Sequence, residues 1–177
     1  MKSLRWVVAF ALSALVALAG CSYARPSVAA EVGATTITDA QVEAATTAVA
    51  TALASEPMRV RPAVLQWLVL GELSRQLNAR NQLGLTDAQR ESSARASRLS
   101  ALMDDPATRD FALNGGDFTY VSDKLGSLEV VQQQAAGIPV MLNPRYGTWD
   151  PATLVIGEPG GLSQPFPRPT ASESTNR

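Results

Sequence analysis

The stretch Ala63-Val64-Leu65-Gln66-Trp67-Leu68-Val69-Leu70 is apolar at every position but one, and the rest of the fold has to cover it. It belongs to a segment that runs from Pro62 to about Leu83, whose second half keeps apolar residues on one side only. Such a segment predicts a helix that lies in the core or lines a groove. Proline suits the first turn of this helix, and Gly84 is expected to end it in the left-handed conformation.

A stripe of four apolar residues, Trp67, Leu70, Leu73 and Leu77, follows helical spacing along this segment. Packing into a core gives such a stripe, and so does a groove that binds apolar peptide segments. Core packing is the commoner cause, but the sequence leaves both alternatives open. These four residues are therefore the candidate peptide-binding residues.

Two capping patterns place helices on both sides of this segment. Thr38-Asp39-Ala40-Gln41 and Thr86-Asp87-Ala88-Gln89 both match the capping box, in which a threonine is followed three residues later by glutamine. The first predicts a helix that Pro57 ends, and the second predicts a helix that reaches about Met103.

Two more helices are predicted further along the chain. Asp105-Pro106 predicts the cap and first position of a short helix through Leu113, which Asn114-Gly115-Gly116 is expected to break. A last helix is predicted over residues 118–136, with Gly137 stopping it.

Short strands are predicted near both ends of the helical part. Residues 30–37 predict two strand pieces around a tight Gly33-Ala34 turn, because glycine suits the first position of a type II′ turn. Residues 140–142 predict a late strand, after which Asn143-Pro144 turns the chain. The fold class is thus mostly α with a small β element.

The N-terminus has the pattern of an export signal. Lys2 and Arg5 precede an apolar run that ends at Leu18-Ala19-Gly20-Cys21, and this run is too short to span a bilayer. The last four residues resemble the lipobox of bacterial lipoproteins. The resemblance implies cleavage before Cys21, diacylglycerol on the Cys21 sulfur, and a lipid-anchored chain on the extracytoplasmic face of the cell membrane.

The composition excludes several kinds of chemistry. The 177-residue chain has one cysteine and no histidine, which excludes His-dependent nucleophiles, His-ligated zinc and a disulfide within one chain. Without Lys2 and Arg5, 13 basic residues face 16 acidic ones, a net charge of about −3 that does not favour nucleic acid. Asp104-Asp105 is better explained as a helix terminus than as a metal or acid–base pair. We therefore expect no enzymatic activity, no metal and no cofactor.

The chain divides into four parts. Residues 1–20 form the predicted lipoprotein signal peptide, 21–29 a tether, 30–156 one helical domain, and 157–177 a tail. The tail is rich in Pro, Gly, Ser and Thr and has no apolar period, which predicts disorder.

Arg145, Tyr146 and Trp149 follow the predicted late strand. Arginine stacks well on aromatic rings, so these residues could bind a ligand. They could instead lock the closing segment of the domain onto the helices, and this second interpretation is favoured.

Two regions of the chain resemble one family. Residues 30–85, with their strand–turn–strand, capped helix and long helix, resemble the N-terminal chaperone region of SurA and its relatives. The closing segment, residues 143–150, resembles that of actinobacterial lipoproteins with a SurA-like N-terminal domain.

The resemblance implies a mostly helical domain whose first strand pairs with a late strand, and a function in holding unfolded or extended polypeptides outside the cytoplasm. A parvulin-type isomerase domain has no room in this chain, so no isomerase activity is expected. The alternative is a structural or adaptor lipoprotein of the cell envelope that binds one folded partner.

Overall fold

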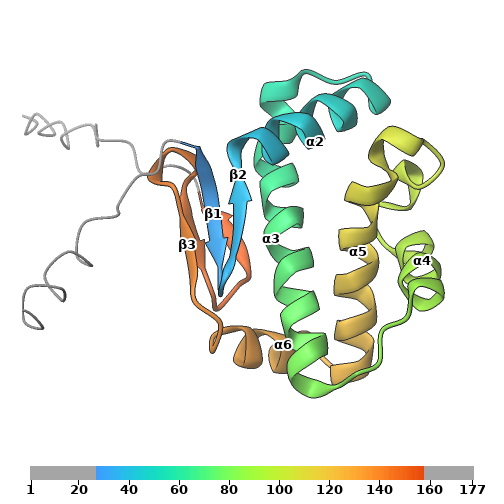
Figure 1. The fold of residues 1–177 in the computed structure, drawn as a ribbon, viewed down its shortest axis with the longest axis vertical. Helices are drawn as coiled ribbons and strands as arrows, with labels where there is room; N and C mark the ends of the chain where they lie inside the picture. The colour runs from blue at the N-terminus through green and yellow to red at the C-terminus, as the bar shows by residue number, and fades with distance from the viewer. Residues whose placement is uncertain (1–26, 158–177) are drawn as a thin grey trace, which may run out of the picture.

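The computed structural model of the protein describes residues 27–157. The predicted signal peptide, Cys21 and residues 158–177 of the predicted tail lie outside the described residues. The fold is mostly helical with a small antiparallel sheet, as predicted (Figure 1). Within the described residues, no helix is long and apolar enough to cross a membrane.

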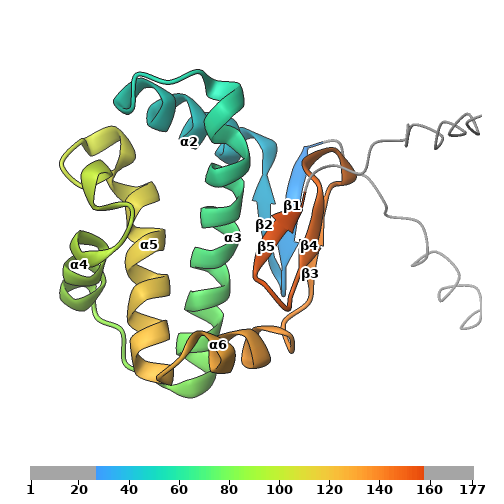
Figure 2. The ribbon, with the colours of Figure 1, turned by 180° about the vertical axis from the view of Figure 1, so that it is seen from behind.

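Helix α3 (Pro57–Asn81) is the central element, with the sheet on one side and α5 on the other in both views (Figures 1 and 2). It begins at Pro57, so the predicted start at Pro62 is wrong. Pro62 removes one backbone hydrogen bond near the start of a 25-residue helix, and burial of the apolar residues that follow outweighs that loss. The helix ends at Gln82, which has a φ of 52°; Gly84 also has a positive φ, but it lies two residues further on.

Helix α2 (Asp39–Ala52) precedes α3, and the predicted capping box at Thr38 is confirmed in both of its hydrogen bonds. The helix ends five residues before Pro57, which is the first residue of α3 instead of the end of α2. Ala54 takes a positive φ of 47° in the connection between them.

Helix α4 (Asp87–Ala96) also starts with its predicted capping box, at Thr86. It ends well before Met103, because the Ser97 hydroxyl accepts a hydrogen bond from the backbone N–H of Leu99 at 3.1 Å and competes with the helical pattern. A short 3₁₀ turn, η2 (Ser100–Leu102), follows.

Helix α5 (Pro106–Leu125) is capped by Asp105 as predicted, but it continues through the glycines that were expected to break it. Gly116 lies against α4: a Cβ there would be 2.3 Å from the carbonyl oxygen of Arg90. The glycines therefore serve close helix packing. The predicted 118–136 helix is divided at Gly126, whose φ is 89°, and α6 (Leu128–Ala135) follows.

The three-stranded sheet has the order β2-β1-β3 and is antiparallel throughout, with β1 (Val28–Val32), β2 (Thr35–Thr38) and β3 (Val140–Leu142). The predicted pairing of an early with a late strand is confirmed. Gly33 has a φ of 57° in the β1–β2 turn. Strand β1 includes Val28 and Ala29, which were placed in the tether, and Ala29 is fully buried.

The sequence did not predict a second hairpin, formed by β4 (Thr148–Asp150) and β5 (Val155–Gly157) after the 3₁₀ turn η3 (Pro144–Tyr146). Its last residue, Gly157, had been assigned to the tail. Leu154, Ile156 and Trp149 pack onto the core that also contains β1, and the hairpin lies beside the sheet in Figure 2.

A partly buried ionic cluster, centred on a fully buried carboxylate, joins the helices. Asp117 on α5 has no exposed surface, and its carboxylate accepts hydrogen bonds from Arg75 of α3 at 2.9 Å and from Nε of Arg90 of α4 at 2.5 Å. Arg75 also pairs with Glu72 at 2.9 Å. A buried carboxylate is tolerated only when it is paired in this way.

Glu72 extends this cluster to the sheet. Its carboxylate accepts hydrogen bonds from Thr35 of β2 and from Gln76, both at 2.8 Å, and Gln76 also donates to the carbonyl of Val32 at 2.7 Å. Burial alone would raise the pKa of Glu72, but the hydrogen bonds from Gln76, Thr35 and Arg75 outweigh it and lower that pKa. The cluster therefore connects the β1–β2 hairpin to three helices.

We predict that Gly116→Ala lowers the free energy of unfolding by about 1–3 kcal/mol. The added methyl group would overlap with backbone atoms of α4, and these atoms can make room only if the whole helix shifts. Chemical denaturation of the variant measures the change. Ser92→Ala, at an exposed position of α4, is the control and should stay within about 0.5 kcal/mol. A stabilised Gly116→Ala protein, as helix propensity alone would give, would contradict the packing argument.

Candidate functional site

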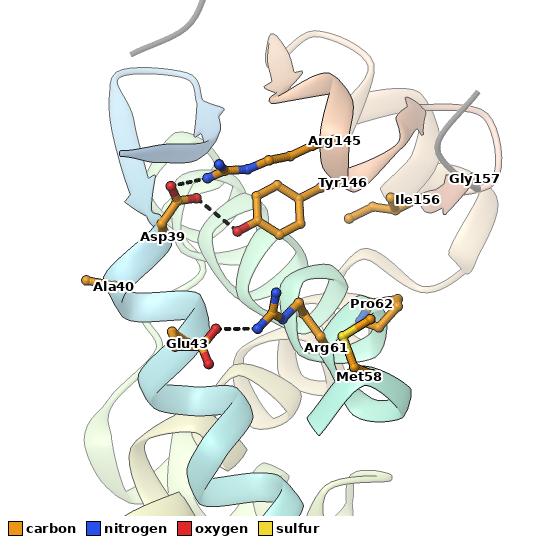
Figure 3. A pocket seen from close by; sticks show the side chains of 10 residues that line it. All are labelled: Asp39, Ala40, Glu43, Met58, Arg61, Pro62, Arg145, Tyr146, Ile156 and Gly157. Atoms are coloured by element: carbon orange, nitrogen blue, oxygen red, sulfur yellow. Dashed lines mark hydrogen bonds and ion pairs between the residues drawn. The ribbon is translucent and has the colours of Figure 1, made fainter. Parts of the chain in front are cut away.

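An open pocket of about 780 Å³ lies where the starts of α2 and α3 face η3 and β5 (Figure 3). Segments far apart in the sequence meet there, because the β1–β3 pairing returns the end of the domain to its beginning. The lining residues are Asp39, Ala40, Glu43, Met58, Arg61, Pro62, Arg145, Tyr146, Ile156 and Gly157.

Asp39 anchors one wall of the pocket. It is the first residue of α2, where a carboxylate is favoured by the positive end of the helix dipole. Its carboxylate pairs with the guanidinium of Arg145 and accepts a hydrogen bond from the Tyr146 hydroxyl at 2.9 Å. Its backbone N–H donates to the carbonyl of Ser27 at 2.9 Å, so the first described residue lies beside the pocket.

The charges of this wall shift two pKa values. The hydrogen bond from Arg145 lowers the pKa of Asp39 below 3.8, against the opposing effect of burial. Burial, followed by the hydrogen bond to Asp39, raises the pKa of Tyr146. The Arg145 guanidinium also lies over the Tyr146 ring, 5.0 Å from its centroid. Asp39 is therefore a carboxylate and Tyr146 a neutral phenol at pH 7.

A second ion pair, Glu43 with Arg61, joins α2 to α3 within the pocket wall. The Nε atom of Arg61 is buried and has no hydrogen-bond partner among residues 27–157. The Arg61 head group is thus held mainly by Glu43, and a ligand that offers an acceptor could compete for it.

The remaining surface of the pocket is apolar. Met58, on the first turn of α3, has 76% of its surface exposed, and Pro62 lies one turn further along the helix. Figure 3 shows the side chains of Tyr146, from η3, and Ile156, from β5, pointing toward α2 and α3. An exposed methionine in a pocket that an aromatic ring also lines is the kind of adaptable apolar surface that binds varied partners.

The predicted peptide-binding stripe lies elsewhere. Leu70, Leu73 and Leu77 are 5%, 2% and 0% exposed and belong to the core. Trp67 is half-buried and meets Phe118 edge-on, with ring centroids 6.0 Å apart. Because these three leucines are buried in the core, they cannot line a peptide-binding groove. The groove alternative is therefore wrong for them.

The closing-segment residues were predicted to lock this segment onto the helices, and the contacts of Arg145 and Tyr146 with Asp39 confirm this. Trp149 packs against the core and does not line the pocket. The sequence identifies Arg145 and Tyr146 as candidates, but it does not predict that their partner is Asp39, a residue of the first capping box.

The sequence missed the other pocket residues. Asp39 was noted only as part of a helix cap. Met58, Arg61 and Pro62 were placed before or at the start of α3, and Ile156 in a region without a predicted strand. Because the pocket needs all of these segments together, local patterns did not reveal it.

The arrangement of side chains suits binding more than proton transfer. The acidic residues in the wall are each paired with arginine. Among residues 27–157, no group of three or more Cys, Asp or Glu side chains is placed to hold a metal ion. Asp105 caps α5, accepting from the N–H of Ala107 at 2.8 Å, and Asp104 pairs with Arg95 at 3.1 Å, as expected for a helix terminus.

Comparisons with protein-family models, with curated proteins and with solved structures found no match for this chain.

We predict that Asp39→Asn lowers Tm at pH 7 by roughly 2–5 °C, since the amide cannot form the ion pair with Arg145. The folded-state pKa of Asp39 is lowered, so its contribution to stability is complete above the unfolded-state pKa and is lost as the pH falls through the folded-state value. The difference in Tm between variant and wild type should therefore shrink below about pH 3.8.

Asp123→Asn, at an exposed position of α5, is the control for this experiment and should leave Tm unchanged both at pH 7 and at acidic pH. Thermal unfolding followed by circular dichroism measures both. A constant difference between Asp39→Asn and wild type down to pH 2 would show that the carboxylate's charge does not stabilise the closing segment.

Proposed function

We propose that this chain is a lipid-anchored protein of the extracytoplasmic face of the cell membrane that binds unfolded or extended polypeptides without catalysing a reaction, as a SurA-like chaperone module would. The binding site in this proposal is the pocket between α2, α3, η3 and β5, and not the Trp67 stripe.

The observation that carries the proposal is the apolar wall of the pocket, in which Met58 and Pro62 are exposed and Tyr146 and Ile156 are half-buried. Apolar side chains of an extended peptide can pack on this wall, while its backbone carbonyl groups can accept hydrogen bonds from the arginine head groups at the rim. Neither interaction requires a particular peptide sequence, which suits a protein with many clients.

The position of the pocket fits a membrane-tethered protein. Ser27 is hydrogen-bonded to Asp39 at the pocket wall, and it is only six positions after Cys21 in the chain. Six extended residues span at most about 20 Å. A lipid on Cys21 would therefore keep the pocket close to the bilayer surface, where newly exported chains emerge.

An adaptor that binds one folded partner is the alternative. The pocket is a concave site lined by ten residues, and its size suits a single extended segment better than the broad surface of a folded protein. Crosslinking from the pocket rim distinguishes the two: many weak clients support the chaperone, and one stoichiometric partner supports the adaptor.

We predict that Met58→Glu weakens binding of an unfolded protein, such as reduced and carboxymethylated lysozyme, by about tenfold. The new carboxylate would have to lose water when an apolar client side chain packs against it. Met58 is mostly exposed, so the substitution should leave the fold intact. Fluorescence anisotropy of the labelled client measures affinity, and suppression of its aggregation measures activity.

Leu128→Glu is the matched control, because Leu128 is an apolar residue with 48% exposure at the start of α6, outside the pocket. It should bind the client as wild type does. Equal affinity of all three proteins would remove the pocket from the proposal, and the absence of any client binding by wild type would remove the chaperone function itself.

We predict that Cys21→Ala abolishes acylation of the chain. When the protein is produced in a bacterial host fed an alkyne-labelled fatty acid, wild type should carry the label and partition into detergent, and the variant should remain unlabelled. Ser22→Ala, one residue away, should be labelled as wild type is. An unlabelled wild-type chain would refute the lipid anchor.

A further inference from the structure

Gly157 both lines the pocket and joins the fold to residues 158–177. The chain therefore leaves the described structure at the wall of its own candidate binding site. Any ligand of the pocket therefore binds beside the point at which this segment is covalently attached.

The sequence of this segment suits the pocket wall. Leu162 and Phe166 are its only large apolar residues, and prolines stand at positions 159, 165, 167 and 169. Proline-rich chains favour the extended polyproline conformation, so they lose little entropy when they bind, and they dock on surfaces that present aromatic rings. Tyr146 presents such a ring, and Met58 presents an exposed apolar side chain in the same pocket.

The distances allow both apolar residues to reach the pocket. Leu162 is five residues from Gly157 and Phe166 is nine, so an extended chain carries them up to about 17 and 30 Å from the rim. Both lengths are sufficient for the chain to fold back so that Leu162 and Phe166 contact the apolar wall of the pocket.

We propose that residues 158–177 occupy the pocket in cis, with Leu162 and Phe166 against the apolar wall around Met58, and thereby compete with polypeptide clients. This inference rests on the proposed function for the identity of the competitor, but occupancy of the pocket by the segment can be tested without any client.

Because the segment is covalently attached to the domain, weak binding is sufficient for it to occupy the pocket. A short linker gives an effective concentration on the order of 1 mM. If the free segment binds with a Kd of roughly 100 µM, occupancy in cis weakens client binding by about tenfold. Removal of the segment should therefore strengthen client binding by about that factor.

The test compares a chain of residues 22–177 with one that stops at Gly157. Both keep residues 27–157, which contain all the described helices and strands and both hydrophobic cores. In the longer chain we expect the NMR signals of the Met58 methyl group and of the Tyr146 ring, both on the pocket wall, to be shifted relative to the shorter chain. A synthetic peptide of residues 158–177, added to the shorter chain, should reproduce shifts at Met58 and Tyr146.

The double substitution Leu162→Ser, Phe166→Ser in the longer chain should abolish the shifts at Met58 and Tyr146 and strengthen binding of carboxymethylated lysozyme about tenfold. Ser172→Ala and Thr175→Ala together are the control and should change neither. Neither pair alters residues 27–157.

Identical Met58 and Tyr146 signals in the long and short chains, with no response to the peptide, would overturn the inference. Client binding in that case would leave the proposed function standing. If the segment binds but no client does, the inference holds and the proposed function fails.

Discussion

The packing of the domain depends on a buried carboxylate. Asp117 has no exposed surface, and its charge is balanced by Arg75 and Arg90 from two neighbouring helices. Without these two arginines the carboxylate would be an uncompensated charge in the core, which is strongly destabilising. Helices α3, α4 and α5 are therefore held in one relative arrangement, and Glu72 connects that arrangement to the first hairpin.

Small residues allow the helices to approach closely enough to make these contacts. A Cβ at Gly71 would lie 2.1 Å from the Asn114 side chain, and one at Gly116 would meet the α4 backbone. The glycines permit the close approach of the helices, and the ion pairs fix the position of the helices relative to one another. The start of α3 and the β1–β3 pairing are positioned as a result, and the pocket forms where they meet the closing segment.

The pocket combines two kinds of contact that have different roles. The Asp39 contacts with Arg145 and Tyr146 attach the closing segment to α2. Met58 and Ile156 supply apolar surface on the other sides. Because both acidic residues in the wall are already paired, the pocket has no strong net charge, and apolar contact is left as the main source of affinity for a ligand.

The sequence alone determined the local features. The capping boxes at Thr38 and Thr86, the Asp105 cap, the Gly33 turn and the strand over 140–142 could be predicted because each depends on neighbours within a few residues. Tertiary structure decided where α3 begins, that α5 passes through Gly115-Gly116, that the leucine stripe is core, and where the pocket lies. These features depend on residues far apart in the chain, such as Asp39 with Arg145 and Gly116 with Arg90. Contacts over such separations override local propensity, and no pattern within a short window records them.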